Sequence, residues 1–172
     1  HMGITAENVA EKYKISRDEQ DLFALNSQRK TQKAINENKF KNEIIKLKIS
    51  IDDKNFIFEK DEHPRSNLKL EDLKKLKTIF KENGTVTAGN SSGINDGAAA
   101  TILMSREEAK FREIEPLAEV ASWASCGVEP SLMGLGPIPA VNMALKKAGW
   151  KIEDVDLFEI NEAFAAQSIA VI

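Results

Sequence analysis

Helical spacing of apolar residues dominates the first part of the chain. Ser16 is followed three residues later by Glu19, the arrangement of a capping box at a helix N-terminus. Apolar side chains then recur among charged ones at Leu22, Phe23, Leu25 and Ile35. This pattern predicts an amphipathic helix from 17 to about 36. Thr5 is expected to cap an earlier helix in the same way.

Strict alternation replaces helical spacing over residues 43–51, where every second position is apolar from Ile45 onward. We therefore predict a half-exposed strand, a turn at Asp52-Asp53, and a partner strand at residues 56–58. The next apolar positions are leucines three residues apart, and they predict a short helix over 70–76. These elements describe a small α+β region rich in lysine.

Residues 84–104 are the stretch around which the rest of the chain is organised. They begin with β-branched residues, continue as a loop with glycines at 89, 93 and 97, and end in an apolar run over 98–104. The run predicts a strand buried on both faces. A polar, glycine-rich loop tied to such a strand is a common support for a ligand. Glycines that serve only the turn are the alternative.

The second half alternates helices and strands. Ser105 predicts a helix cap, residues 117–123 a strand, and 127–139 a loop rich in Gly and Pro. Residues 140–148 predict a helix stopped by Gly149. Residues 155–160 then predict a strand, and 161–167 open a final helix. This order is typical of α/β layers with a mixed or parallel sheet.

The net charge, the apolar runs and the cysteine count exclude several classes of protein. The 172 residues carry a net charge of −3, which gives no electrostatic footprint for nucleic acid. No apolar run approaches the roughly 18 residues of a membrane span. Cys126 is the one cysteine, so no internal disulfide is possible and a reducing compartment is the simpler interpretation. No spacing of His, Cys, Asp and Glu resembles a metal site.

Two candidate nucleophile motifs are weak. Residues 89–93 (GNSSG) match the G-x-S-x-G elbow of α/β-hydrolases, which needs a histidine downstream, but His1 and His63 both lie upstream. The loop also lacks the Lys of a phosphate-binding P-loop. Cys126 has no neighbouring histidine in the sequence and is interpreted as a small buried hydrophobic residue.

Asn161 and Glu162 stand where a predicted strand passes into a helix. A side-chain amide at this position could polarise a carbonyl directly or through a water molecule. Asparagine is also a favoured N-cap, so Asn161 could equally serve only to start the last helix. The residues themselves leave both interpretations open.

Three long motifs resemble one family. Residues 85–100 read TVTAGNSSGINDGAAA, residues 133–140 MGLGPIPA, and residues 161–167 NEAFAAQ. They are similar to the middle of biosynthetic-type thiolases, the acetyl-CoA acetyltransferases. Residues 1–10 (HMGITAENVA) resemble a further segment of that family, and the resemblance covers the whole chain in order.

The resemblance implies a thiolase-like layered α/β fold, a mixed sheet with helices, present here incompletely. Residues 1–94 would form an α+β loop domain that binds CoA. Residues 95–114 would end the N-terminal thiolase half, and 115–172 would begin the C-terminal half.

The resemblance also implies site residues, all carried over by motif position. Asn161 would hold the water of an oxyanion hole. The residues implied for CoA binding are Ser92, Arg65, Ala88, Gly89, Ile94, Asp72, Leu73, Ile79 and Phe80. Ser92 would bond the pantetheine arm, Arg65 would lie near the adenine and phosphates, and Ile79 stands where alanine is more usual. The acyl pocket would use His1, Met2, Met133, Ala163 and Phe164. No metal is implied.

The implied activity is condensation of two acetyl-CoA to acetoacetyl-CoA, and the reverse thiolysis, with CoA thioesters as substrates and no tightly bound cofactor. The family's nucleophilic Cys, its His in a G-H-P segment and its second Cys have no counterpart in this sequence. We therefore expect the chain alone to be inactive. The alternative is a non-catalytic CoA-binding or assembly module. We also expect the complete protein to be a dimer or tetramer and to lie in the cytoplasm. We expect no nucleic-acid partner and no membrane partner.

Overall fold

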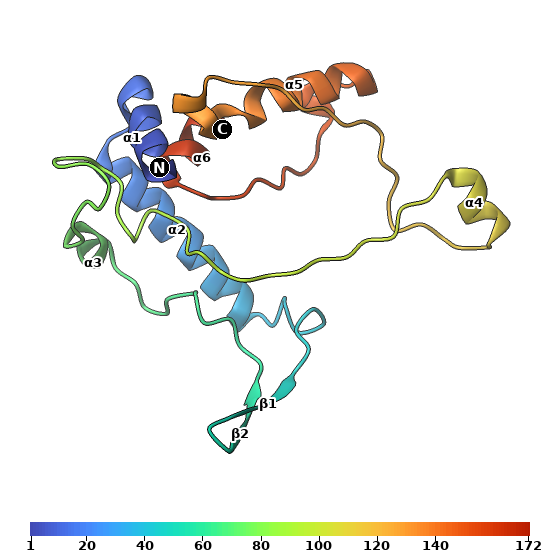
Figure 1. The fold of residues 1–172 in the computed structure, drawn as a ribbon, viewed down its shortest axis with the longest axis horizontal. Helices are drawn as coiled ribbons and strands as arrows, with labels where there is room; N and C mark the ends of the chain where they lie inside the picture. Colours follow the sequence, from blue (N-terminus) through green and yellow to red (C-terminus); the bar gives the residue numbers. More distant parts are fainter.

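The computed structural model describes all 172 residues. In chain order the elements are helices α1 (Met2–Tyr13) and α2 (Arg17–Asn36), strands β1 (Leu47–Ile51) and β2 (Lys54–Phe58), helices α3 (Leu70–Lys74) and α4 (Arg106–Phe111), the 3₁₀ turn η1 (Pro130–Leu135), helix α5 (Pro137–Ala148), the 3₁₀ turn η2 (Ile152–Asp154) and helix α6 (Ala165–Val171). Figure 1 shows α1, α2, α3 and α6 gathered together, with the β1–β2 hairpin and α4 projecting from them.

The first two helices begin at different kinds of cap. The predicted capping box of α2 is confirmed: the Glu19 amide donates to Ser16 Oγ at 3.2 Å, and the Ser16 amide donates to Glu19 Oε2 at 2.7 Å. Hydrogen bonding to Ser16 also holds the pKa of Glu19 below its ordinary value. The predicted Thr5 cap is wrong. The ring Nδ1 of His1 takes that role instead, accepting from the Gly3 amide at 3.0 Å, and Thr5 lies inside α1.

The packed part of the molecule lies where α1 meets α6 and η1. Small apolar residues of α1 face α6, and Ala10 packs with Ile15 and Ala166. Short side chains let the two helices approach closely, so the C-terminal helix is held directly against the N-terminal one. The same α6 contacts α2, which in turn contacts α3. This assembly is the support on which the loops of the candidate site lie.

Local signals predicted two further elements correctly. Strands β1 and β2 form an antiparallel hairpin joined at Asp52-Asp53, with Leu47 opposite Phe58. A hydrogen bond from Lys46 beside this hairpin lowers the pKa of Glu59. Helix α5 ends at Gly149, whose φ of 71° is the left-handed conformation expected of a helix-ending glycine. The helix begins at Pro137, three residues before the predicted start.

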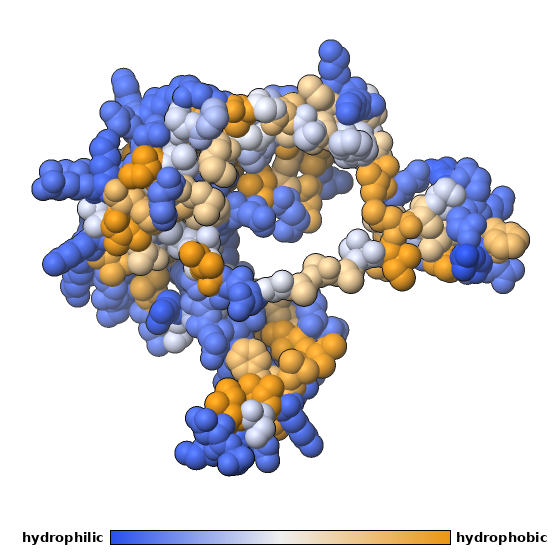
Figure 2. Space-filling model, in the orientation of Figure 1, coloured by the Kyte–Doolittle hydropathy of each residue, from blue (hydrophilic) through white to orange (hydrophobic).

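The three strands predicted for a larger sheet are not formed. Residues 98–104, 117–123 and 155–160 are extended or irregular, and the only sheet is the β1–β2 hairpin. The physical reason is that an isolated strand leaves its backbone groups unpaired and its apolar faces uncovered. Ile102 is 88% exposed and Leu117 is fully exposed. Figure 2 shows hydrophobic residues along these open segments.

Only 19 of the 172 residues are buried, so most of the apolar surface of the second half remains uncovered. No helix is both long enough and apolar enough to cross a membrane.

Candidate functional site

The glycine-rich loop is anchored to α1 by a buried carboxylate. Glu7 is 4% exposed and accepts the Thr85 amide at 2.9 Å on each of its two oxygens. It also accepts the Thr85 hydroxyl at 3.0 Å and the Val86 amide at 2.8 Å. Both buried carboxylate oxygens are therefore satisfied by hydrogen bonds, which compensates the loss of contact with water. The start of the loop is therefore fixed to α1.

Asn90 closes the same loop from within. Its Oδ1 accepts the Thr87 amide at 2.8 Å, and its Nδ2 donates to the Thr85 carbonyl at 3.1 Å and to Asp21 Oδ1 at 3.0 Å. The other oxygen of Asp21 pairs with Arg17 at 2.7 Å. This network ties the loop to α2. Asn90 and Ser91, at the centre of the G-x-S-x-G match, therefore have structural roles. Ser91 accordingly donates its hydroxyl to the Thr87 carbonyl at 2.6 Å.

The glycine-rich loop meets the NEAFAAQ motif directly. The Ser92 amide donates to the Ala163 carbonyl at 3.0 Å, and the Ala165 amide donates to the Asn90 carbonyl at 2.9 Å. Between them Ser91 and Phe164 form an antiparallel bridge. Two motifs separated by some seventy positions in the sequence thus lie edge to edge. The predicted residues Ser92, Ala163 and Phe164 are brought together by this pairing.

An apolar pocket of about 380 Å³ lies beside this junction. Five of the residues that line it were predicted for the site: Met2, Met133, Asn161, Ala163 and Phe164. Sequence reasoning missed Gln167, which also lines the pocket and whose Oε1 is buried without a hydrogen-bond partner. The only sequence signal that pointed to Gln167 was its position at the end of the NEAFAAQ motif. The pocket can hold a small apolar group next to the amide of Asn161.

Aromatic rings close the site near the N-terminus of α1. The His1 and Phe80 rings have centroids 4.8 Å apart, and Phe80 meets Phe164 edge-on at 6.3 Å. Gly3 permits this packing, because a Cβ there would lie 2.3 Å from the Phe80 ring. Lys81 binds Glu11 of α1 at 3.0 Å, and that hydrogen bond raises the pKa of Lys81. Phe80 therefore contacts both of the other rings predicted for the site, those of His1 and Phe164.

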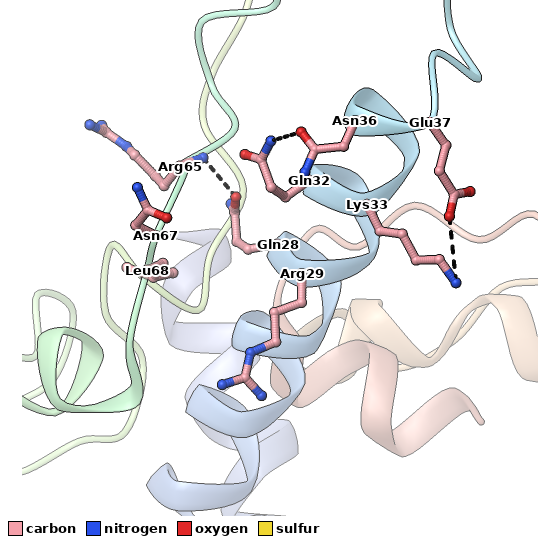
Figure 3. Close-up of a pocket in the computed structure, with 9 residues that line it drawn as sticks. All are labelled: Gln28, Arg29, Gln32, Lys33, Asn36, Glu37, Arg65, Asn67 and Leu68. Atoms are coloured by element: carbon pink, nitrogen blue, oxygen red, sulfur yellow. Dashed lines mark hydrogen bonds and ion pairs between the residues drawn. The ribbon is translucent and has the colours of Figure 1, made fainter.

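A polar cavity of about 440 Å³ lies against the C-terminal half of α2, and Arg65 lines it (Figure 3). The Arg65 amide donates to Gln28 Oε1 at 2.8 Å. Arg29 and Lys33 of α2 add positive charge, and Glu37 pairs with Lys33 at 3.8 Å. The cavity suits an anionic group better than an apolar one, because its lining is almost wholly polar and carries more positive than negative charge.

Asp72 and Leu73 do not line the Arg65 cavity. Asp72 accepts the Lys69 amide at 3.2 Å at the start of α3. Leu73 is 2% exposed and lies under the glycine-rich loop, where a Cβ on Gly89 would come within 2.5 Å of it. Leu73 therefore supports the loop from beneath and presents almost no surface to a ligand.

The remaining predicted wall residues are uncovered. Ile94 is fully exposed, Ile79 is 56% exposed, and Ala88 is also exposed. Asn161 is exposed at the pocket rim and does not cap α6, since that helix begins after Phe164 without a side-chain cap. The N-cap interpretation of Asn161 is therefore wrong.

Cys126 and the acidic residues supply no second site. Cys126 is half-buried rather than buried, and its Sγ lies 4.0 Å from the sulfur of Met143. No group of three or more metal-ligating side chains exists in the structure. Neither a cysteine nor a histidine lines the apolar pocket.

The chain matches two family models, "Thiolase, N-terminal domain" over residues 1–107 and "Thiolase, C-terminal domain" over residues 114–172. Acetyl-CoA acetyltransferase of Shinella zoogloeoides is 52% identical over 171 residues, which is 99% of this chain and 44% of that relative. The chain thus spans less than half the length of the curated relatives it matches.

Solved structures also match the whole of this chain with less than half of their own length. The acetyl-CoA acetyltransferase of Bacillus anthracis superposes with a TM-score of 0.93 at 48% identity, over 99% of this chain and 43% of the other. Human mitochondrial 3-ketoacyl-CoA thiolase in complex with CoA gives a TM-score of 0.89 at 46% identity, over 99% and 42% of the two chains. The predicted fold class is confirmed, with the mixed helix-and-strand content of a partial thiolase fold.

Proposed function

The chain belongs to the thiolase family, and from that premise we propose that it is the central part of an acetyl-CoA C-acetyltransferase. The complete protein condenses two acetyl-CoA to acetoacetyl-CoA and runs the reverse thiolysis. Residues 1–94 are its CoA-binding loop domain, 95–114 end the N-terminal half, and 115–172 begin the C-terminal half. The relatives that carry the acetyltransferase name support the substrate.

The chemistry has two acyl transfers. A base takes the proton of a cysteine thiol, and the thiolate attacks the thioester carbonyl of the first acetyl-CoA. The C–S bond to CoA breaks, and the CoA thiolate takes the proton back from that base and leaves as the thiol. The second acetyl-CoA then loses an α-proton to a base, and its carbanion attacks the acyl-enzyme carbonyl and releases the cysteine. The nucleophile and the bases lie outside this sequence. We propose that the complete protein is a dimer or tetramer in the cytoplasm; one relative, from Rattus norvegicus, carries the name cytosolic acetyl-CoA acetyltransferase.

This chain contributes binding and electrostatic stabilisation. Asn161 holds a water that donates to the thioester oxygen as negative charge develops on it. Ser92 bonds the pantetheine arm, with Ala88, Gly89 and Ile94 beside it. Arg65 binds the nucleotide end, with Asp72 and Leu73 nearby in the sequence and Ile79 and Phe80 as apolar wall. The acyl group lies among His1, Met2, Met133, Ala163 and Phe164.

One observation carries the proposal most strongly. The Ser92 amide bonds the Ala163 carbonyl at 3.0 Å, so the loop proposed for pantetheine adjoins the motif proposed for the thioester. A thioester sulfur links pantetheine to the acyl group, and a site for it needs these two elements side by side. The apolar pocket at that junction is the space for a short acyl chain.

The test is titration of the purified chain with CoA, followed by NMR. We expect weak binding that Ser92→Ala reduces about three- to tenfold, the effect of one lost hydrogen bond of about 0.5–1.5 kcal/mol. Ser50→Ala in the hairpin is the matched control and leaves the affinity unchanged. Equal affinities for the wild type and Ser92→Ala would overturn the role of Ser92.

Turnover is tested separately. We expect no thiolysis of acetoacetyl-CoA by the purified chain, because it lacks the nucleophile and base. Measurable turnover by this exact sequence would refute the assignment of catalysis to residues outside it.

A further inference from the structure

Two adjacent residues of α2 reach toward two loops that are remote from each other in sequence. Ser27 Oγ donates to Glu162 Oε2 at 2.6 Å, one residue after Asn161. Gln28 Oε1 accepts the Arg65 amide at 2.8 Å, as Figure 3 shows. A single turn of one helix therefore touches both loops.

These two bonds attach residues 61–67 and residues 156–162 to α2. No other hydrogen bond joins residues 61–67 to the rest of the chain. Residues 156–162 likewise make no hydrogen bond to other elements apart from that of Glu162. Loss of the Gln28 bond therefore leaves residues 61–67 without a hydrogen bond to the rest of the chain. Residues 156–162 lose their one direct bond when Ser27 is removed, although the next residue, Ala163, stays bonded to Ser92.

A cavity of about 220 Å³ separates the two attachments. Ser27, Gln28 and Glu162 line it, together with His63 and Ser92. Gln28 also lines the polar cavity of Arg65, so the two cavities adjoin through this one side chain. A ligand that reached from Arg65 to Ser92 would pass Gln28.

Helix α2 is a rigid spacer for this purpose. It runs for 20 residues behind a complete capping box, and Leu25 on the same turn is buried. A residue-to-residue rise of about 1.5 Å fixes the relative positions of Ser27 and Gln28 on the helix. The separation of the two loops is set by where these neighbours hold them.

We propose that Ser27 and Gln28 are positioning residues that set the distance between the Arg65 loop and the Asn161–Glu162 loop, and so match the site to the full length of a CoA thioester. This rests on the proposed function, in which Arg65 and Asn161 serve opposite ends of that ligand. Neither residue of α2 needs to touch the reacting atoms.

The first measurement is backbone ¹⁵N relaxation of the purified chain. Gln28→Ala is expected to lower the order parameter of the Arg65 amide to below about 0.6, the range of flexible backbone, and to leave Glu162 unchanged. Ser27→Ala is expected to leave Arg65 unchanged and to lower the order parameter of the Glu162 amide by a smaller amount, because Ala163 stays bonded to Ser92. Gln28→Glu and Ser27→Thr retain the bonding atom and restore wild-type values. The control Gln32→Ala breaks only a bond within α2, to Asn36, and changes neither loop. Unchanged order parameters in both alanine variants would overturn the proposal.

The second measurement compares CoA with pantetheine, which lacks the nucleotide. Gln28→Ala is expected to weaken CoA about fivefold, consistent with one lost hydrogen bond, and to leave pantetheine unchanged, while Ser27→Ala weakens both equally. If α2 only stabilised the fold, each variant would weaken the binding of CoA and of pantetheine to the same extent. Equal effects of Gln28→Ala on the two ligands would overturn the positioning role. A wild-type chain that binds neither ligand, with the relaxation effects present, would instead overturn the proposed function.

Discussion

Asn90→Asp is the sharpest perturbation of the glycine-rich loop, because it changes one atom and almost no volume. The Nδ2 that donates to Asp21 at 3.0 Å and to the Thr85 carbonyl at 3.1 Å becomes an oxygen. Asp21 is fully buried and Asn90 is 3% exposed, so water cannot replace either bond. Two carboxylates then face each other in a buried space.

The expected cost follows from the bonds. A hydrogen bond to a charged group contributes about 1.5–3 kcal/mol, and an acceptor left unpaired costs about 1 kcal/mol more. Two carboxylates this close also disfavour each other's charged form, which adds to the cost. We therefore expect about 3 kcal/mol of local destabilisation at pH 7, or about 100-fold in the opening equilibrium of the loop.

Amide hydrogen exchange measures this directly, because the bonded amides of Thr85, Val86 and Thr87 lie in the loop. Their exchange should accelerate about 100-fold in Asn90→Asp at pH 7, after correction for intrinsic rates. Asn142→Asp, on the exposed face of α5, is the matched control and should leave these amides unchanged. Exchange within threefold of the wild type would refute the account of the loop as held by Asn90.

Three further changes test other parts of the account. Glu7→Ala should destabilise the loop by about 3 kcal/mol, because it leaves buried amides without an acceptor, and urea unfolding should show it; an unchanged midpoint would contradict this. Gly3→Ala should displace Phe80 and weaken CoA binding severalfold, whereas Gly127→Ala, with open space around it, should not; equal effects would count against the aromatic contact. Because the pKa of Glu19 is lowered on folding, its stabilisation is complete above its unfolded pKa and is lost as pH falls through the lower folded value. Acid titration of α2 helicity should show this loss, and Glu19→Gln should abolish it.

Elements with short-range signals were predictable from the sequence. The capping box of α2, the Asp52-Asp53 hairpin turn and the glycine that ends α5 each depend on residues within a few positions. Sheet strands depend on partners far away in the chain, and residues 98–104 find none here. The sequence pattern correctly identified an apolar segment but could not supply its neighbours.

In the candidate site, too, the sequence motifs identified some residues, whereas tertiary packing decided the role of others. Motif resemblance named Ser92, Ala163 and Phe164, and the structure joins them through backbone hydrogen bonds. The motif resemblance could not show that Leu73 is buried beneath the loop, because burial depends on tertiary packing. It also missed Gln167, since a polar residue on a short helix carries no signal of its own until the pocket beside it is known.

We propose that this chain provides the surface for a CoA thioester. Titration of ¹⁵N-labelled chain with CoA, with chemical shifts followed residue by residue, shows whether it does. The shifts are expected to concentrate at residues 88–94 and 161–164 and at Arg65, and pantetheine is expected to reproduce all but the shift at Arg65. No shift at saturating CoA, or shifts confined to α4, α5 and the β1–β2 hairpin, would contradict it.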